Sequence, residues 1–243
     1  MLPTTSDPRQ PRAIVVGGSG GIGAALKRGL AGKGYVVTAL SREPNKSGAG
    51  DGLAIDVTSA PSIEAAAARL RDKAPFLAIL IATGLLHDAD VRPEKSLREL
   101  NQTSLMRLFA VNSVGPALVA KHFVPLLPKH GRCIFAVLSA RVGSIDDNRL
   151  GGWYGYRASK AALNMLMKTL AIELGRTHPE AICIALHPGT VDTSLSKPFQ
   201  KAVALDRLFS PDEAAGYLLD ALDQLTPAQS GRCYAWDRAE IRP

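Results

Sequence analysis

Short apolar runs alternate along this chain with longer segments in which apolar residues recur at helical spacing. Runs such as Ile14 to Val16, which are rich in β-branched residues, are typical of strands buried on both faces of a parallel sheet. Strands are predicted over residues 13–16, 36–41, 52–55, 77–82, 132–139, 181–187 and 232–235. Helices are predicted over residues 21–32, 62–73, 103–127, 156–176 and 211–226. This alternation predicts parallel strands with helices on both faces.

The length and the uninterrupted pattern predict one folded unit. A chain of 243 residues is long enough for one well-buried α/β domain and short for two. We therefore predict a single doubly wound domain of Rossmann type over residues 12–243, with a central, mainly parallel seven-stranded sheet. Residues 1–11 are polar and proline-rich, and we expect them to be a disordered tail. The turn-rich segment 43–51 is expected to be mobile.

The composition limits which binding partners and which cellular compartment are expected. No apolar run approaches the ~18 residues of a membrane span, and the first residues lack the apolar core of a signal peptide, so no membrane association is expected. Cys133, Cys183 and Cys233 show no paired spacing, and the histidines show no metal-binding spacing, so we expect buried thiols, no metal and a cytoplasmic location. The net charge of +7 comes from scattered Lys and Arg, whereas nucleic-acid binding would need a clustered patch. The pattern is that of a solvated cationic surface, with at most a mild electrostatic preference for an anionic cofactor.

A glycine-rich turn follows the first predicted strand and opens the first predicted helix. Two spacings fit at once: Gly18, Gly20 and Gly23 form G-x-G-x-x-G, and Gly17, Gly21 and Gly23 form G-x-x-x-G-x-G. Glycines permit a tight turn and a close approach of the backbone to a pyrophosphate, which the helix N-terminus attracts. In this context of strand, turn and helix, the pattern predicts a dinucleotide site rather than a structural turn alone.

The segment Tyr156-x-x-x-Lys160 carries the candidate chemistry. Good helix formers follow it, and residues four apart share a helix face, so the phenol should lie beside the ammonium. A nearby positive charge favours the phenolate, so we expect Lys160 to lower the pKa of Tyr156 and make it an acid or base usable near working pH. Tyr154 has no lysine four residues after it and is the weaker candidate.

Together these motifs resemble the short-chain dehydrogenase/reductase family, from about residue 12 to residue 236, and within it the C-factor-like branch. The resemblance implies an active site of a serine with Asn112, Tyr156 and Lys160, in which Asn112 supports a water-linked proton route to Lys160. It also implies cofactor contacts beyond the catalytic pair, at Gly17, Ser19, Gly21, Ile22, Gly23, Ser41, Arg42, Asp56, Val57, Gly84, Pro188, Gly189, Val191 and Thr193.

The end of the second predicted strand bears on the choice of nucleotide. An NAD enzyme places an acid about 20 residues past the glycine turn to bond the ribose hydroxyls. This chain has Ser41 and Arg42 there, and a guanidinium suits a 2′-phosphate, so NADP(H) is favoured over NAD(H). Glu43, one residue later, is the feature that opposes this interpretation.

The catalytic serine has two candidates. By resemblance the family's serine stands where this chain has Ala140, so Ser139 would need a local twist or bulge at the strand end to come into register. Ser144 lies nearer the usual distance from Tyr156; we favour Ser139. A second departure is Ile81-Ala-Thr-Gly84, where the family has Asn-Asn-Ala-Gly.

The segment from Ser194 to Ser210 is predicted to form a lid over a small-molecule site. Apolar residues would form its wall and three cations could attract an anion: Leu195, Phe199, Val203, Leu205 and Leu208, with Lys197, Lys201 and Arg207. The same pattern is that of a plain amphipathic helix. By resemblance, helices 103–127 and 156–176 would form a subunit interface, which predicts a homodimer or homotetramer.

Two functions remain open. The first is an oxidoreductase that transfers a hydride between NADP(H) and a carbonyl or alcohol substrate, a carbonyl reductase or alcohol dehydrogenase. The second is a dinucleotide-binding signalling or redox-sensor protein of C-factor type without significant turnover. The intact pair of Tyr156 and Lys160 favours the enzyme, because a sensor has no need of it.

Overall fold

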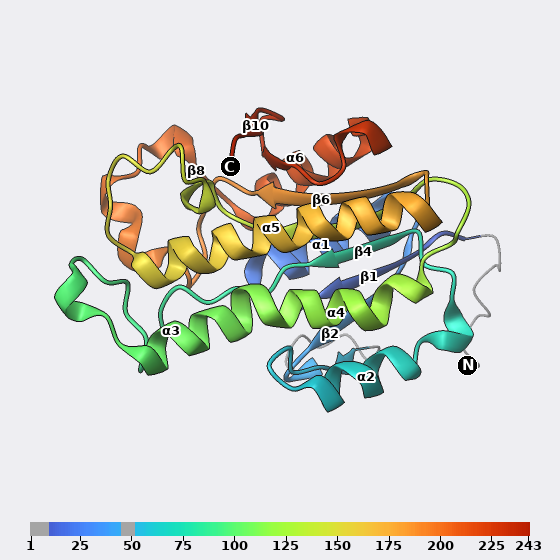
Figure 1. Ribbon diagram of the computed structural model, residues 1–243. Helices are drawn as coiled ribbons and strands as arrows, with labels where there is room; N and C mark the ends of the chain where they lie inside the picture. The colour runs from blue at the N-terminus through green and yellow to red at the C-terminus, as the bar shows by residue number, and fades with distance from the viewer. Residues whose placement is uncertain (1–9, 45–51) are drawn as a thin grey trace, which may run out of the picture.

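An eight-stranded sheet runs through the centre of the molecule in the order β10-β9-β6-β5-β4-β1-β2-β3 (Figure 1). The computed structural model describes residues 10–44 and 52–243, without the side chains of Ala202 and Leu205. The strands are β1 (Arg12–Val16), β2 (Val36–Ser41), β3 (Leu53–Ala54), β4 (Ala78–Ile81), β5 (Cys133–Leu138), β6 (Ala181–His187), β9 (Cys233–Ala235) and β10 (Glu240–Ile241). Only β10 is antiparallel to its neighbour within this sheet.

Helices cover both faces of the sheet because each strand alternates apolar side chains between two cores. One core joins the sheet to α2 (Ala60–Ala68), α4 (Gly115–Phe123) and α5 (Tyr154–Thr177), which lie in front in Figure 1. The other joins it to α1 (Gly21–Gly32) and α6 (Pro211–Gln224), on the far face. The expected doubly wound α/β domain with a mainly parallel sheet is confirmed.

The remaining elements are short. Helix α3 (Gln102–Phe109) leads into the π-helical turn η4 (Ala110–Val114), and a small sheet pairs β7 (Thr190–Val191) with β8 (Leu208–Phe209). Short 3₁₀ segments are η2 (Arg71–Lys73), η3 (Leu97–Glu99), η5 (Val124–Leu126), η6 (Arg141–Gly143), η7 (Lys197–Ala202), η8 (Leu205–Arg207) and η9 (Pro227–Gln229). The expected tail and mobile segment fall mostly on residues 1–9 and 45–51, which lie outside the described residues.

The predicted helix over residues 103–127 is a run of four helical segments, α3, η4, α4 and η5. Within the 25-residue run Gln102–Leu126, an 18-residue window has a mean hydropathy of 1.2, so the run is long and apolar enough to span a membrane, as the core helix of a globular protein can also be. Val119 and Phe123 are fully buried in the core on the front face of the sheet. Packing against the sheet therefore accounts for part of the apolar character of the run, while Met106 and Val114 are exposed.

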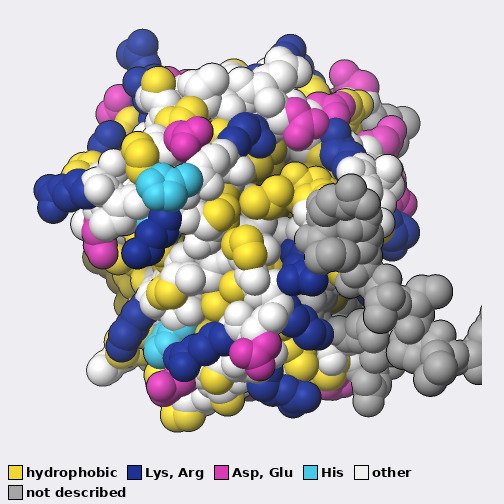
Figure 2. Space-filling model, turned by 90° about the vertical axis from the view of Figure 1, so that its right-hand side faces the viewer, with side chains coloured by type: hydrophobic (Ala, Val, Ile, Leu, Met, Phe, Trp, Pro, Cys, Tyr) yellow, Lys and Arg dark blue, Asp and Glu magenta, His cyan; other side chains and the backbone are white. Residues whose placement is uncertain are grey.

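Charged side chains are interspersed on the face at the amino ends of the strands. Figure 2 shows Lys and Arg spread among Asp and Glu there, rather than gathered in one field. Binding of a polyanion requires a clustered basic patch. The opposite edge of the sheet, where the parallel strands end, holds the candidate site.

Candidate active site

The glycine turn after β1 forms a cradle that side chains would fill. Gly17 has a φ of 88°, and a Cβ there would lie 2.9 Å from the carbonyl carbon of Ala82. A Cβ on Gly23 would lie 2.1 Å from the Gly17 oxygen, whereas one on Gly20 would meet its nearest atom at 3.4 Å. A Cβ on Gly18 would also lie close to another atom, 2.7 Å from the Ala39 Cβ, so Gly20 is the member of the two spacings that sterics do not require. All three glycines of the spacing that begins at Gly17 are sterically required.

Helix α1 begins at Gly21 with no side-chain cap, so its first backbone N–H groups are available to a ligand. The turn is anchored from behind, because the amides of Gly17 and Gly18 donate to Leu40 O at 2.7 and 3.0 Å. A close backbone, free N–H groups and a helix N-terminus fit the pyrophosphate of a dinucleotide. Ser19 and Ile22 lie in this turn, as the sequence predicts.

The ends of β2 and β3 place the nucleotide-selecting residues together. Ser41 is buried, and Arg42 extends into solvent just beyond it. Hydrogen bonds from Thr58 lower the pKa of Asp56, chiefly through its hydroxyl, and the nearby Arg42 guanidinium adds to that effect. Arg42 and Asp56 therefore lie close enough to interact at the end of the sheet.

Helix α5 presents Tyr156 and Lys160 at the same edge. Both residues are buried, and Lys160 Nζ lies 5.8 Å from the centre of the Tyr156 ring. Lys160 Nζ donates to the carbonyl oxygen of Leu138 at 2.9 Å, which ties α5 to the end of β5. A Cβ on Gly84 would lie 3.8 Å from Lys160 Nζ, so the loop after β4 passes directly over the lysine.

The pKa of Tyr156 moves in the opposite direction to the one expected from its lysine. Burial raises the pKa of the Tyr156 phenol, because the phenolate would lose its hydration. Burial also lowers the pKa of Lys160 to about 8, against a smaller opposing effect of Cys233. Desolvation is therefore the largest cause of both pKa shifts in this structure.

Asn112 sits fully buried on the π-helical turn η4. Its Oδ1 accepts from the Leu85 amide at 2.8 Å, and its Nδ2 donates to Leu85 O at 2.7 Å and to Ser159 Oγ at 3.0 Å. These bonds hold the loop after Gly84 against α5. Pro116 has no amide hydrogen for the carbonyl four residues earlier, that of Asn112, and this is the sequence signal that could have shown the irregular turn.

The two candidate serines both have partners within the protein. Ser139 is 4% exposed, and its Oγ donates to Asn164 Oδ1 on α5 at 2.7 Å. Ser144 is also buried, and its Oγ accepts from the Asp147 amide at 3.1 Å. Neither of these bonds is to Tyr156.

The local twist or bulge that would bring Ser139 into register is not present at the end of β5. The ladder between β5 and β6 continues regularly, with the Ser139 amide donating to Leu186 O at 2.7 Å, and Ala140 keeps extended dihedrals of −152° and 149°. Successive residues on extended backbone point to opposite sides. Ser139 therefore reaches Asn164, while Ala140 packs in the cluster that contains Tyr156.

An apolar and aromatic cluster surrounds Tyr156. Its buried members are Leu86, Val91, Leu108, Ala140 and Tyr156, and the partly buried side chains packed against them are Leu85, Val142, Trp153, Leu195 and Phe199. Leu195 and Phe199 come from the expected lid segment, and both pack against this cluster. The aromatic ring of Phe199 lies 4.9 Å from that of Trp153 and 5.6 Å from that of His87, between ring centres.

The other lid predictions have mixed outcomes. The segment forms 3₁₀ turns rather than one amphipathic helix. Lys197 pairs with Asp192 at 3.4 Å, whereas the side chain of Leu205 lies outside the described ones. Lys201 and Arg207 are exposed.

The turn after β6 brings the lid next to the glycine cradle. Gly189 has a φ of 77°, and a Cβ there would lie 2.7 Å from the Phe209 ring. A Cβ on Gly21 would lie 2.8 Å from Thr193 Cγ2, so the two predicted cofactor segments meet. Val191 is buried between them and α6, in a cluster with Phe209.

Two buried residues near the site were missed from the sequence. Glu94 is 3% exposed; its Oε2 accepts from the Gly155 amide at 3.2 Å, and its main-chain oxygen accepts from Trp153 N at 2.5 Å. His187 ends β6 with a buried Nδ1 that has no partner among the described residues. Burial, and secondly Arg141, lowers the pKa of His187 to about 4. Neither residue belongs to a local motif that could have indicated its role.

The site has the parts of a proton-transfer centre beside a dinucleotide cradle. No three His, Cys, Asp or Glu side chains gather as metal ligands within residues 10–44 and 52–243. A buried phenol, a buried lysine and an apolar wall converge at the ends of β4 and β5. Such an arrangement can exchange a proton with a small apolar substrate.

Comparison with known proteins gives three findings. A family model described as short chain dehydrogenase matches residues 11–204. The chain is 33% identical over 223 residues to the 1-hydroxy-2-glutathionyl-2-methyl-3-butene dehydrogenase of Rhodococcus sp., covering 90% of this chain and 93% of that protein. It is 33% identical over 147 residues to the C-signal of Myxococcus xanthus, covering 60% of this chain and 82% of that protein.

The fold is also that of a solved reductase. The NADPH-bound carbonyl reductase from chicken fatty liver superposes with a TM-score of 0.82 and 23% sequence identity, covering 97% of this chain and 100% of that chain.

Proposed function

This chain belongs to the short-chain dehydrogenase/reductase family, and we propose that it is an NADP(H)-dependent reductase of a small carbonyl compound, or the dehydrogenase of the matching alcohol. The observation that carries the proposal is the burial of Tyr156 beside Lys160 at the sheet edge that also holds the glycine cradle. A protein that only binds a dinucleotide has no need of a buried phenol and lysine at that edge.

The proposed reaction divides the work between cofactor and protein. When bound, the reduced nicotinamide supplies the hydride that reaches the carbonyl carbon. Tyr156 supplies the proton from its phenol hydroxyl to the substrate oxygen. Because burial raises the pKa of Tyr156, the phenol keeps its proton at neutral pH, which is the form that reduction requires. Lys160, with a pKa of about 8, is mostly charged at neutral pH and stabilises the phenolate left behind.

Asn112 and Ser139 complete the proposed set. The bonds of Asn112 to Leu85 fix the loop that follows Gly84. Ser139 would polarise the substrate carbonyl once its hydroxyl leaves Asn164. Replacing Ser139 by alanine is expected to lower kcat/KM, while Ser144→Ala leaves it nearly unchanged. Equal rates for both variants would assign the donor role to Tyr156 alone.

The proposed preference for NADP(H) rests on Arg42. Its guanidinium extends from the end of β2 beside buried Ser41, where a 2′-phosphate would gain a planar cationic partner. The NADPH-bound carbonyl reductase of similar fold supports this choice.

The test of function is a panel of aldehydes and ketones assayed with NADPH and with NADH. Because the Rhodococcus relative is named for a glutathionyl alcohol, the panel should include a glutathione conjugate with a free hydroxyl, assayed for oxidation. Turnover that disappears in Tyr156→Phe supports the proposal. NADPH binding without turnover of any compound on the panel favours the second candidate.

The second candidate is a dinucleotide-binding signalling protein without significant turnover. The observation that favours it is the 33% identity to C-signal over 147 residues. For either candidate we propose a cytoplasmic homodimer or homotetramer. Exposed apolar side chains on α3, η4 and α5 support a subunit interface there: Met106, Val114, Leu166 and Ile172. Sedimentation showing only monomer at micromolar concentration would contradict it.

A further inference from the structure

A cavity of about 480 Å³ lies between α5 and the sheet edge formed by β6, β9 and β10. Its volume is in the range of small-molecule sites, about 300–1,000 Å³. None of the apolar residues packed around Tyr156 lines it. The cavity is therefore a compartment separate from the proposed carbonyl site, although both use α5.

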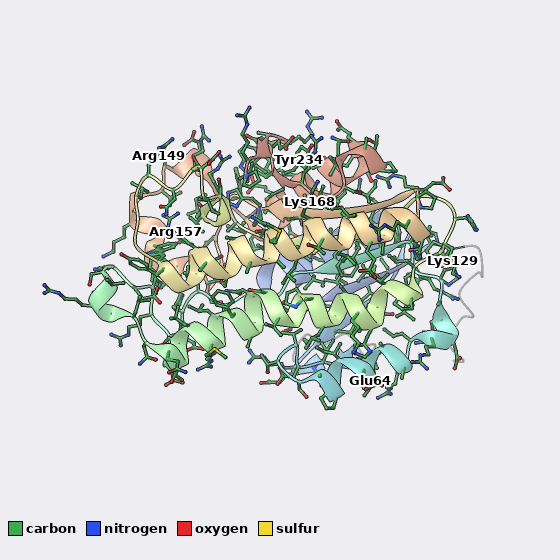
Figure 3. The ribbon with its side chains drawn as sticks, viewed as in Figure 1. Glu64, Lys129, Arg149, Arg157, Lys168 and Tyr234 are labelled. Carbon is green, nitrogen blue, oxygen red and sulfur yellow. The ribbon has the colours of Figure 1, made fainter. Side chains whose placement is uncertain are left out.

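Two of the donors in the cavity come from one face of α5. Asn164 and Lys168 are four residues apart and both line it, as successive turns of one helix face do. Figure 3 shows Lys168 on the side of α5 that lies towards Tyr234 of β9. Within the part of the chain that the structure describes, the Lys168 ammonium and the Asn164 Nδ2 have no hydrogen-bond partner. The site therefore offers an unused cation and an unused amide donor.

The remaining wall residues indicate which groups a ligand could carry in addition to a hydrogen-bond acceptor. Ile145, Met165 and Ile241 contribute apolar surface, and the first two are largely exposed at the rim. The opposite cation, Arg232, is paired with Glu240 at 2.9 Å, whereas Lys168, which is exposed, has no ion pair among the described residues. A carboxylate attached to a short apolar body matches this distribution.

The cavity is connected to the catalytic residues by contacts in its wall. Asn164 Oδ1 accepts the Ser139 hydroxyl at 2.7 Å, so a ligand that draws on the Asn164 amide acts on the partner of that serine. Gly143 also lines the cavity, and a Cβ there would lie 2.8 Å from Lys160 Cβ. Cys233, a third wall residue, is close enough to influence the pKa of Lys160.

From these contacts we infer that the cavity is a second ligand site, which takes a small apolar carboxylate and modulates turnover through Asn164 and Ser139. A ligand shifts an activity only if it binds two states of the protein unequally. The Ser139 hydroxyl provides such states, one bonded to Asn164 and one released towards the substrate. The modulation, but not the binding, rests on the proposed function.

The test uses octanoate as the probe and 1-octanol as its neutral counterpart. Isothermal titration calorimetry of the full chain is expected to show octanoate binding, weakened by about tenfold or more in Lys168→Gln because a charge-assisted contact is lost. Ala161→Leu, which puts a larger side chain into the cavity from α5, is expected to abolish binding. Lys121→Gln, an exposed lysine on α4 outside the cavity, is the matched control and is expected to bind as the wild type does.

Turnover is measured in parallel with any carbonyl accepted by the enzyme. Octanoate is expected to change kcat of the wild type by about fivefold or more without competing with the carbonyl, and to have no effect on Lys168→Gln. Binding that is unchanged in both cavity variants, or equal for 1-octanol, would overturn the site. Octanoate that binds but competes with the carbonyl, or leaves kcat unchanged, would overturn the coupling. If no carbonyl is turned over, the calorimetry still decides the site, and the failure belongs to the proposed function.

Discussion

Replacing Glu94 by alanine is expected to loosen the start of the catalytic helix. Helix α5 has no side-chain cap of its own: its N-cap residue, Trp153, has a φ of 54° and makes no capping bond. Glu94, from a loop about sixty residues earlier, supplies the acceptor instead, through Oε2 to the Gly155 amide. Tyr156 is the next residue, so the carboxylate positions the proposed acid without touching it.

The magnitude follows from what the substitution removes. A lost N-cap acceptor costs about 1 kcal/mol, and the buried methylene that is lost with it about 0.8 kcal/mol. One term opposes these losses: Glu94 Oε1 is buried without a partner among the described residues, so removing it recovers part of a desolvation cost. The expected net loss of stability for Glu94→Ala is therefore about 1–2 kcal/mol. Glu94→Gln keeps an acceptor oxygen and is expected to lose less than half of that.

The assay combines urea unfolding with steady-state kinetics. Because a small misplacement of a catalytic group is costly, kcat of Glu94→Ala is expected to fall about 10- to 100-fold, with partial recovery in Glu94→Gln. Affinity for NADPH is expected to stay near that of the wild type, since the glycine cradle lies on other elements. Glu99→Ala is the matched control, because Glu99 accepts from the Lys95 amide at 3.0 Å but is exposed.

Two results would refute this reasoning. The first is a Glu94→Ala protein with unchanged stability and kcat. The second is an equal loss in Glu99→Ala, which would show that the loop, rather than the cap of α5, is responsible. A fall in kcat that glutamine restores would separate positioning of Tyr156 from a general loss of structure.

Three further predictions concern the proton donor, the nucleotide and pH. Tyr156→Phe is expected to lower turnover by ~10²–10⁴ while NADPH still binds, and Tyr154→Phe to be nearly silent; near-normal turnover in Tyr156→Phe would overturn the mechanism. Arg42→Asp is expected to raise the Kd for NADPH, measured by fluorescence titration, much more than that for NADH. An equal loss of affinity for both cofactors would contradict the proposed preference for NADP(H). Burial lowers the pKa of His187 from its ordinary value of 6.5 to about 4. Between these two pH values the imidazole is protonated in the unfolded chain and neutral in the folded one. The free energy of unfolding therefore rises as pH rises from 4 to 6.5. His187→Asn is expected to flatten that rise in urea titrations, and an unchanged slope would contradict the argument.

Local patterns predicted the sheet because the strands are short and apolar on both faces. Each of the seven predicted strands has its counterpart in the sheet. The eighth strand, β10, is two residues long and pairs antiparallel with β9, so its own sequence carries too little signal. The interruption of the predicted helix 103–127 at η4 depends on Pro116 and on the tertiary hydrogen bonds of Asn112. Neither feature changes the hydrophobic periodicity from which the helix was predicted.

The proximity of Tyr156 and Lys160 could be predicted because both lie on one helix, where spacing fixes the face. Their pKa values could not, because these depend on burial by segments distant in the chain, and burial reverses the expected direction for Tyr156. The role of Glu94 could not be predicted for the same reason, because its hydrogen bond to Gly155 joins residues 61 positions apart.

At Ser139, the register of the strand determines which side chain faces the Tyr156 cluster. Ser139 and Ala140 are neighbours on an extended segment, and a shift by one residue would exchange the sides to which they point. With the ladder held by the bond from Ser139 N to Leu186 O, the hydroxyl faces Asn164 and a methyl group faces the Tyr156 cluster. The register thereby gives the Ser139 hydroxyl a partner, Asn164, that also lines the second cavity. Asn164 therefore contacts both the proposed active-site serine and the second cavity, and one hydrogen bond links the two compartments.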